Sequence, residues 1–388
     1  MEKSNEITKG LKIGIDASNI RQGGGLTHIK ELLSFSQPDR FAIKKIIIWG
    51  GRETLDELQE RPWLKKICPP EIDYCWLSRI FWQRYLLPKK AYDACCDILF
   101  VPGGSHSGKF RPVVTVCQNM LPFERREIMR YGLSRRALRL IILRLLQLKS
   151  FRNSDGVIFL TRYAKEQVLK KIDYIKTNET IIPHGISSRF KRSPKKQKPI
   201  SHYNNNNPFR LIYVSTIDFY KHQWNVVEAV ELIQEDFPVV LDLIGPAYEP
   251  ALSRLKASLE KFKLASKNIF YHGNVPYEEL YQYYDKADLG IFASSCENLP
   301  IVLLENMAMG LPIACSERDP MTELLGDGGV YFDPEKPKDI SRAIRKLIDS
   351  PKLREDKVKT SHQIAQNFSW KHCANKTLSF LSETAKKF

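Results

Sequence analysis

Short apolar runs that alternate with helical stretches constrain the fold of this chain more than any other feature. The first run, Lys12–Asp16, leads through the glycine-rich loop Arg21–Gly25 into a helical stretch that begins near Leu26. A strand, a glycine loop and a helix in this order open a doubly wound α/β domain. Four similar runs follow, at Ile46–Trp49, Ile98–Val101, Val113–Cys117 and Gly156–Leu160. Because these runs are apolar almost throughout, they predict parallel strands that are buried on both faces.

A change in composition then divides the chain. Residues 191–208 combine a basic, proline-punctuated stretch with the run Asn204–Pro208, and neither can form a core. Beyond them the alternation resumes, with strands predicted at Phe209–Val214, Val239–Ile244, Ile269–His272, Leu289–Ala293 and Pro312–Cys315, and helices at Trp224–Ile233, Ile301–Met309, Ile340–Asp349 and Trp370–Ala385. The sequence therefore predicts two α/β domains, residues 1–190 and 209–370, joined by a linker at 191–208. A C-terminal helix, residues 371–388, is expected to pack back toward the first domain.

Composition and charge exclude several other classes of protein. The 388 residues carry 60 Lys and Arg against 44 Asp and Glu. These basic residues are spread along both halves of the chain, and no nucleic-acid recognition motif accompanies them, so we expect no nucleic-acid partner. The eight cysteines include no C-x-x-C pair, which favours reduced thiols in a cytosolic protein over a zinc or redox site. The N-terminus lacks the apolar core of a signal peptide, and no apolar run is long enough to span a membrane.

The segment Ser294–Glu305 carries the strongest chemical signal. Glu297 lies between a predicted strand and a predicted helix, where Pro300 suits the first helical position. Glu305 follows eight residues later, on the second turn of that helix. The free amides at the N-terminus of this helix favour a bound anion. The Glu297 carboxylate beside that anion could accept hydrogen bonds from sugar hydroxyls, and the Glu305 carboxylate could reach a ribose diol. Without this context, two glutamates at this spacing are ordinary surface acids.

At these residues the chain resembles glycosyltransferase family 4, the glycosyl transferases group 1 of bacterial type. The family signature, two glutamates separated by seven residues, is matched by Glu297 and Glu305. Further motifs resemble the family at Asn298–Pro300, Met307–Pro312, Gly273–Pro276, Glu323–Leu325, Tyr331–Pro334 and Ile182–Ile186. The resemblance is dense from about residue 150 to residue 375. It implies the GT-B fold, in which two Rossmann-like doubly wound domains face each other across a cleft.

The resemblance also implies an activity and roles for individual residues. It implies transfer of a sugar, with retention of configuration, from a nucleotide-sugar held by the C-terminal domain to a glycan or lipid-linked acceptor in bacterial surface polysaccharide or lipopolysaccharide biosynthesis. Carried over by position, Glu297 contacts the reacting sugar, Lys221 binds the diphosphate and Glu305 binds the ribose. A cation is required there because the leaving diphosphate gains negative charge. The remaining implied donor contacts are Ser215, Thr216, Gly245, Pro246, Asn298, Leu299, Pro300, Ile301, Gly24 and Gly25.

The chain departs from the family pattern beside its lysine. Thr216 stands where many relatives carry an arginine, five residues before Lys221. Either Lys221 and the helix amides suffice for the diphosphate, or a basic residue elsewhere compensates. No D-x-D motif occurs, so we expect an enzyme that needs no metal and no other cofactor. The alternative is a nucleotide-sugar-binding protein without transferase activity, such as a hydrolase, a pseudoenzyme or an assembly scaffold.

A second departure follows the predicted strand Val113–Cys117. Relatives usually offer a histidine there, whereas this chain has Gln118 and Asn119. Both amides can contact the donor sugar or the acceptor, but neither can act as a base. His106, in the glycine-rich loop 102–108, is a further candidate for acceptor contact.

The segment Tyr131–Ser150 has an unusual charge pattern. Its basic residues are Arg135, Arg136, Arg139, Arg144 and Lys149, and it contains no acid. It is either a core helix with one solvated face or a helix that lies on an anionic membrane surface near a lipid-linked acceptor. We expect a cytoplasmic protein, and the second alternative adds peripheral association with the inner face of the plasma membrane.

Overall fold

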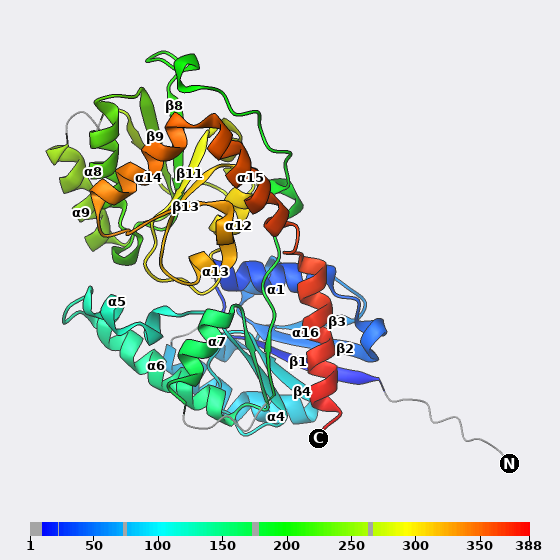
Figure 1. Ribbon diagram of the computed structural model, residues 1–388. Helices are drawn as coiled ribbons and strands as arrows, with labels where there is room; N and C mark the ends of the chain where they lie inside the picture. Colours follow the sequence, from blue (N-terminus) through cyan, green and yellow to red (C-terminus); the bar gives the residue numbers. More distant parts are fainter. Residues whose placement is uncertain (1–9, 22, 73–75, 173–177, 263–266) are drawn as a thin grey trace. The chain divides into compact units, whose positions relative to one another are not determined.

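The computed structural model describes residues 10–21, 23–72, 76–172, 178–262 and 267–388 (Figure 1). The chain divides into two compact units. Unit 1 comprises Met1–Asn119, Ile141–Gly185 and Trp370–Phe388, and unit 2 comprises Met120–Leu140 and Ile186–Ser369. Each unit is built on one parallel sheet, as the alternating pattern predicts.

The sheet of unit 1 has seven strands in the order β3-β2-β1-β4-β5-β6-β7. Their bounds are Leu11–Ala17 (β1), Ile43–Gly50 (β2), Leu64–Ile67 (β3), Ile98–Val101 (β4), Val113–Cys117 (β5), Gly156–Phe159 (β6) and Asn178–Ile181 (β7). The central strands β4, β5 and β6 are buried throughout, which explains their apolar sequences. The edge strands β3 and β7 are absent from the sequence prediction because their polar, partly exposed residues give no apolar run.

The helices of unit 1 are mostly short. They are α1 (Gly24–Phe35), α2 (Arg52–Asp56), α3 (Trp76–Phe81), α4 (Leu87–Asp93), α7 (Arg162–Leu169) and α16 (Trp370–Ala385). The C-terminal helix α16 groups with this unit, where Ser382 Oγ donates to the carbonyl of Phe41 at 3.2 Å. Helix α6 (Arg135–Asn153) is shared, because its first six residues belong to unit 2. None of the helices in the described ranges is both long enough and apolar enough to cross a bilayer.

The sheet of unit 2 has six strands in the order β10-β9-β8-β11-β12-β13. Their bounds are Phe209–Val214 (β8), Val239–Ile244 (β9), Ile269–Tyr271 (β10), Leu289–Phe292 (β11), Ile313–Ser316 (β12) and Val330–Phe332 (β13). The helices of the unit are α5 (Arg125–Met129), α8 (Gln223–Gln234), α9 (Glu249–Lys261), α11 (Leu280–Lys286), α12 (Ile301–Ala308), α13 (Met321–Leu325), α14 (Pro337–Asp349) and α15 (Pro351–Ala365). The direction of strand addition reverses between β8 and β11, and ligands of such sheets bind at the carboxyl ends of the strands beside this switch point.

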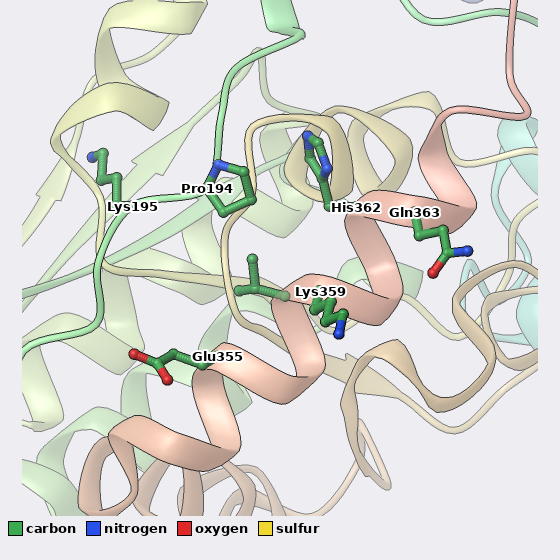
Figure 2. A pocket seen from close by; sticks show the side chains of 7 residues that line it. Pro194, Lys195, Glu355, Lys359, His362 and Gln363 are labelled. Carbon is green, nitrogen blue, oxygen red and sulfur yellow. The ribbon is translucent and has the colours of Figure 1, made fainter.

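The segment predicted as a linker, residues 191–208, packs against unit 2. The fully buried guanidinium of Arg354 on α15 donates to the Gln197 side chain at 2.9 Å and to the Lys198 carbonyl. A buried guanidinium needs such acceptors, so it holds this stretch in place. Figure 2 shows Pro194 and Lys195 on one side of an open pocket of about 430 Å³, whose other lining residues are Glu355, Val358, Lys359, His362 and Gln363 of α15.

The division into units also differs from the predicted domains at Met120–Leu140. The sequence prediction placed this stretch within the N-terminal domain, residues 1–190, whereas the structure groups it with unit 2. Arg126 and Arg130 of this stretch both form ion pairs with Glu335. Contacts of this kind join residues about two hundred positions apart, so the pattern of strands and helices could not indicate them.

Candidate functional site

Two loops meet at the switch point of unit 2. One follows β8 and ends in the short 3-10 turn Phe219–Lys221, and the other follows β11 and contains Glu297. The backbone amide of Ser295 donates to the carbonyl of Tyr220 at 2.8 Å. The Ser295 hydroxyl also lies 2.9 Å from Nε2 of His222. These bonds hold the two loops together.

An ion pair between Lys221 Nζ and Glu297 Oε1 links the same loops. The two side chains are only 10% and 15% exposed. Nζ also lies 5.0 Å from the ring centroid of Tyr220 and 5.5 Å from that of Phe292. Little water surrounds the pair, so each charge acts strongly on any group that enters between the loops. The sequence identified Lys221 and Glu297 separately, and the structure brings them together.

The helix after Glu297 begins at Ile301, the start of the predicted range, and Pro300 precedes it instead of occupying the first helical position. Pro300 has φ −74° and ψ 91°, so it caps α12 and is not its first residue, which is Ile301. The carbonyl of Pro300 accepts hydrogen bonds from the amides of Leu303 and Leu304 at 3.0 and 3.3 Å. The amides of Ile301 and Val302 precede these bonds and belong to the set that a helix leaves without intrahelical partners. The expected anion-binding amides therefore lie four and five residues after Glu297 in the chain.

Asn298 and Leu299 complete this turn. They are 6% and 8% exposed, so both are buried between Glu297 and the start of α12. Little of either residue reaches the surface, and the contact of Asn298 and Leu299 with a donor remains a prediction.

Glu305 occupies the second turn of α12, as predicted, but it is buried. It is 1% exposed, and its two carboxylate oxygens accept hydrogen bonds from Tyr277 at 2.8 Å and Tyr284 at 3.4 Å. Burial raises the pKa of Glu305 to about 7, although the two phenol hydroxyls act in the opposite direction. A ribose that binds Glu305 therefore has to share this carboxylate with Tyr277.

The predicted donor residues after β8 and β9 hold neighbouring loops together. Gln223 Nε2 donates to Ser215 Oγ at 2.8 Å and to the Thr216 carbonyl at 3.0 Å. Gly245 has φ 143°, and a Cβ atom there would lie 2.2 Å from the Ser215 carbonyl oxygen, so only glycine permits this approach. Pro246 accepts a hydrogen bond from the backbone of the β8 loop at 2.8 Å. Whether these four residues also touch a donor remains a prediction.

A buried aspartate in the β8 loop reveals residues that the sequence analysis missed. Asp218 is 1% exposed and accepts hydrogen bonds from Tyr131 Oη at 2.8 Å and Arg136 Nη2 at 2.6 Å. It also caps the turn that ends at Lys221, because its Oδ1 accepts from the amide of the next residue at 2.8 Å. The Arg136 guanidinium lies 4.8 and 4.2 Å from the ring centroids of Tyr131 and Tyr248. We call this group the Asp218 clamp.

The Asp218 clamp bears on the missing arginine. The Arg136 guanidinium pairs with Asp218, which lies two residues after Thr216 in the β8 loop. The Arg136 side chain remains 32% exposed. The pairing joins positions 82 residues apart, so no local motif could reveal it. The only signal in the sequence is the run of arginines without acids, which left a core helix and a membrane-surface helix both open.

One predicted site residue of unit 1, Gln118, contacts a buried histidine. Gly24 and Gly25 form the start of α1, and nothing within 4 Å would obstruct a Cβ atom at Gly24. Gln118 Nε2 lies 2.8 Å from Nδ1 of His28, and its Oε1 lies 3.8 Å from the Cβ position of Gly25. Asn119 is exposed. The structure therefore brings Gly25 and Gln118 together.

His28 is part of an aromatic stack that keeps it neutral. Its ring stacks on His184 at 4.4 Å, and His184 stacks on Trp370 at 5.3 Å. Burial lowers the pKa of His28 to about 4 and that of His184 well below its ordinary value. A neutral His28 can accept the hydrogen bond from Gln118, so it orients that amide.

His106 is placed by a different contact. Its backbone amide donates to Ser150 Oγ of α6 at 2.9 Å, and burial lowers the pKa of its ring. Its contact with an acceptor remains a prediction. Among the residues with described positions, no three His, Cys, Asp or Glu side chains are grouped so that they could hold a metal ion.

Comparisons with known proteins agree with this architecture. The two parallel sheets define a GT-B fold. The chain superposes on sucrose-phosphate synthase from Thermosynechococcus elongatus with a TM-score of 0.72, 15% identity and coverage of 95% and 97% of the two chains. It superposes on Anabaena HepE, solved with UDP and glucose, with a TM-score of 0.68, 16% identity and coverage of 96% and 100%. At these identities the likeness shows the fold alone.

The sequence of unit 2 matches a known family model. Residues 194–363 match the model of the Glycosyl transferases group 1, so the resemblance drawn from Glu297 and Glu305 is confirmed over this part of the chain. The O-antigen chain mannosyltransferase B of Escherichia coli is 27% identical over 169 residues, which are 43% of this chain and 44% of that protein. The chain spans about half the length of the curated relatives it matches.

Proposed function

We propose that the protein is a retaining glycosyltransferase that moves a sugar from a nucleotide-sugar donor to a glycan or lipid-linked acceptor. One observation carries the proposal: the ion pair between Lys221 and Glu297 at the switch point of unit 2. It offers a cation to a leaving diphosphate and a carboxylate to the attached sugar at adjacent positions.

The proposed chemistry requires stabilisation of a departing anion. As the bond from the sugar to the diphosphate breaks, negative charge develops on the diphosphate oxygens, and Lys221 Nζ and the amides of Ile301 and Val302 offset it. Glu297 accepts hydrogen bonds from the sugar and stabilises positive charge that develops at its reacting carbon. Because these groups balance the diphosphate, we propose that the reaction needs no divalent metal.

A bacterial surface glycan is the proposed destination of the sugar. The similarity to a protein named as an O-antigen chain mannosyltransferase supports this class of product. We propose that the protein works in the cytoplasm, at the inner face of the plasma membrane, where a lipid-linked acceptor would be presented.

The second candidate is a nucleotide-sugar-binding protein without transferase activity, such as a hydrolase, a pseudoenzyme or an assembly scaffold. Two observations favour it: Thr216 stands where many relatives carry an arginine, and Gln118 stands where they usually offer a histidine. The Asp218 clamp weakens the first objection, because the Arg136 guanidinium of α6 binds Asp218 in the same loop as Thr216.

A transfer assay separates the two candidates. Purified protein is incubated with UDP- and GDP-linked hexoses and a lipid extract as acceptor, and products are followed by mass spectrometry. The proposal expects a hexose adduct on the acceptor, whose anomeric configuration, determined by NMR, matches that of the donor. Free hexose without an adduct would support a hydrolase, and an inverted linkage would contradict retention.

A further inference from the structure

Helix α6 exposes an apolar stripe to solvent. Its inward side is buried through Ala137, Leu140, Leu148 and Phe151. Its outward side carries five large apolar residues, which are 59%, 47%, 47%, 63% and 42% exposed: Leu138, Ile141, Ile142, Leu145 and Leu146. Residues three and four positions apart adjoin on a helix, so these side chains form one continuous stripe. Such a contiguous exposed stripe marks a site of interaction with an apolar partner.

Basic side chains flank the stripe at both ends. Arg135 and Arg139 lie toward the start of the helix, Lys149 and Arg152 lie toward its end, and all four are exposed. No acidic residue occurs between Glu127 and Asp155 in the sequence. We call the five apolar and four basic residues the α6 outer face. Arg136 does not belong to it, because Arg136 is bound in the Asp218 clamp.

We propose that the α6 outer face binds an anionic lipid bilayer, with the helix lying in the plane of the surface. The apolar side chains would enter the boundary between headgroups and acyl chains, while the long arginine and lysine side chains reach the lipid phosphates. This interaction goes beyond the transfer of a sugar and does not depend on it. If the acceptor is lipid-linked, as proposed above, the surface would let the protein meet it in two dimensions.

The charge pattern distinguishes a bilayer from a second copy of the chain. Pairing two α6 outer faces would bring four basic side chains of each copy together, with no acid on either helix to offset them. Like charges placed across an interface oppose association. An anionic bilayer offers apolar depth and phosphate groups along the whole length of the helix, so it matches both parts of the face.

Co-sedimentation with vesicles tests the proposal. The vesicles contain either phosphatidylcholine alone or phosphatidylcholine mixed with phosphatidylglycerol. The protein should bind the anionic vesicles more tightly, and high salt should weaken this binding because the Debye length falls from about 10 Å at 0.1 M to about 3 Å at 1 M. Binding to neither kind of vesicle, or equal binding to both without a salt effect, would overturn the proposal.

A charge-reversal variant locates the binding surface. Each basic residue near an anionic leaflet contributes about fivefold to the partition coefficient, so Arg135→Glu, Arg139→Glu and Lys149→Glu together should lower it by at least about a hundredfold. The matched control reverses three exposed lysines in and just after α16, Lys371→Glu, Lys376→Glu and Lys386→Glu, and should change binding only severalfold. Equal loss in both variants would show that overall charge, not the α6 outer face, is responsible.

A second variant tests the apolar stripe and is designed to fold. Ile142→Ser with Leu145→Ser alters residues that are already 47% and 63% exposed, so the melting temperature should be retained. Binding should fall about tenfold or more even at low salt, whereas Phe270→Ser, at an exposed site on β10, should have no effect. If the stripe variant instead abolishes a dimer in sedimentation velocity and vesicle binding never occurs, the face belongs to a protein interface and the proposal fails. Donor turnover is measured in a separate assay, so this outcome would not contradict the proposed transferase activity.

Discussion

Replacing Glu305 with Gln should flatten the pH dependence of stability in unit 2. The carboxyl group has a pKa near 7 in the folded protein, above its ordinary value of 4.5, because burial disfavours the charged form. Between these values the folded state binds more protons than the unfolded state, so the stabilising contribution is fully present below pH 4.5 and is lost as the pH rises through 7. The variant Glu305→Gln keeps the shape of the side chain and removes its titration.

The size of the effect follows from the two pKa values. Glu305 should lose about 2.5 kcal/mol of stabilisation between about pH 5 and pH 8. One kcal/mol shifts the melting temperature of a domain of 150–250 residues by about 2–4 °C, so the wild-type transition should fall by about 5–10 °C more than that of Glu305→Gln.

Differential scanning calorimetry at several pH values measures this difference. The matched control is Glu279→Gln, because Glu279 is an exposed carboxylate in the same unit. The control should follow the wild-type pH profile, since both keep the buried carboxyl group. If Glu305→Gln also follows the wild-type profile, Glu305 does not titrate as a buried group and the reasoning is refuted.

Three further predictions concern the proposed reaction. Glu297→Gln should lower kcat for transfer about a hundredfold, the scale of losing one transition-state contact, and normal turnover would remove Glu297 from the mechanism; Gln is preferred to Ala because its amide oxygen can still accept a hydrogen bond from the buried Lys221. Arg136→Gln should lower kcat/KM for the donor about tenfold, because it releases the turn that holds Lys221, and Arg136→Lys should restore it. The control Arg126→Gln should change kcat/KM little, because Arg126 is 62% exposed in its ion pair with Glu335. EDTA should leave turnover unchanged, and activity that disappears with EDTA and returns with Mg²⁺ would contradict metal independence.

The sequence predicted the strands that matter most for the site. The buried strands β4, β5, β8 and β9 have the bounds predicted from their apolar runs, because a strand covered on both faces has no polar alternation to obscure it. The loops after β8 and β11 follow from these bounds, so Lys221 and Glu297 could be located in advance. Their pairing could not, since it depends on the strand order β8-β11, which the sequence does not specify directly.

Features of unit 2 also escaped the sequence analysis, for different physical reasons. Strand β13 consists of three residues and is too short to give a periodic signal. Helix α15 carries mainly polar residues, although Ser350 with a proline after it is a recognisable helix start. The Asp218 clamp and the tyrosines on Glu305 depend on contacts between distant segments, which no local pattern encodes.

Binding of a nucleoside diphosphate tests the central claim most directly. Calorimetric titration with UDP, GDP and ADP should show that at least one of them binds, and at a hundred times its Kd this ligand should stabilise the protein by about 2.7 kcal/mol. Lys221→Ala should abolish the binding, whereas Lys256→Ala, at an exposed site on α9, should preserve it. Failure of all three diphosphates to bind, or equal binding to Lys221→Ala, would contradict a donor site at the Lys221–Glu297 pair.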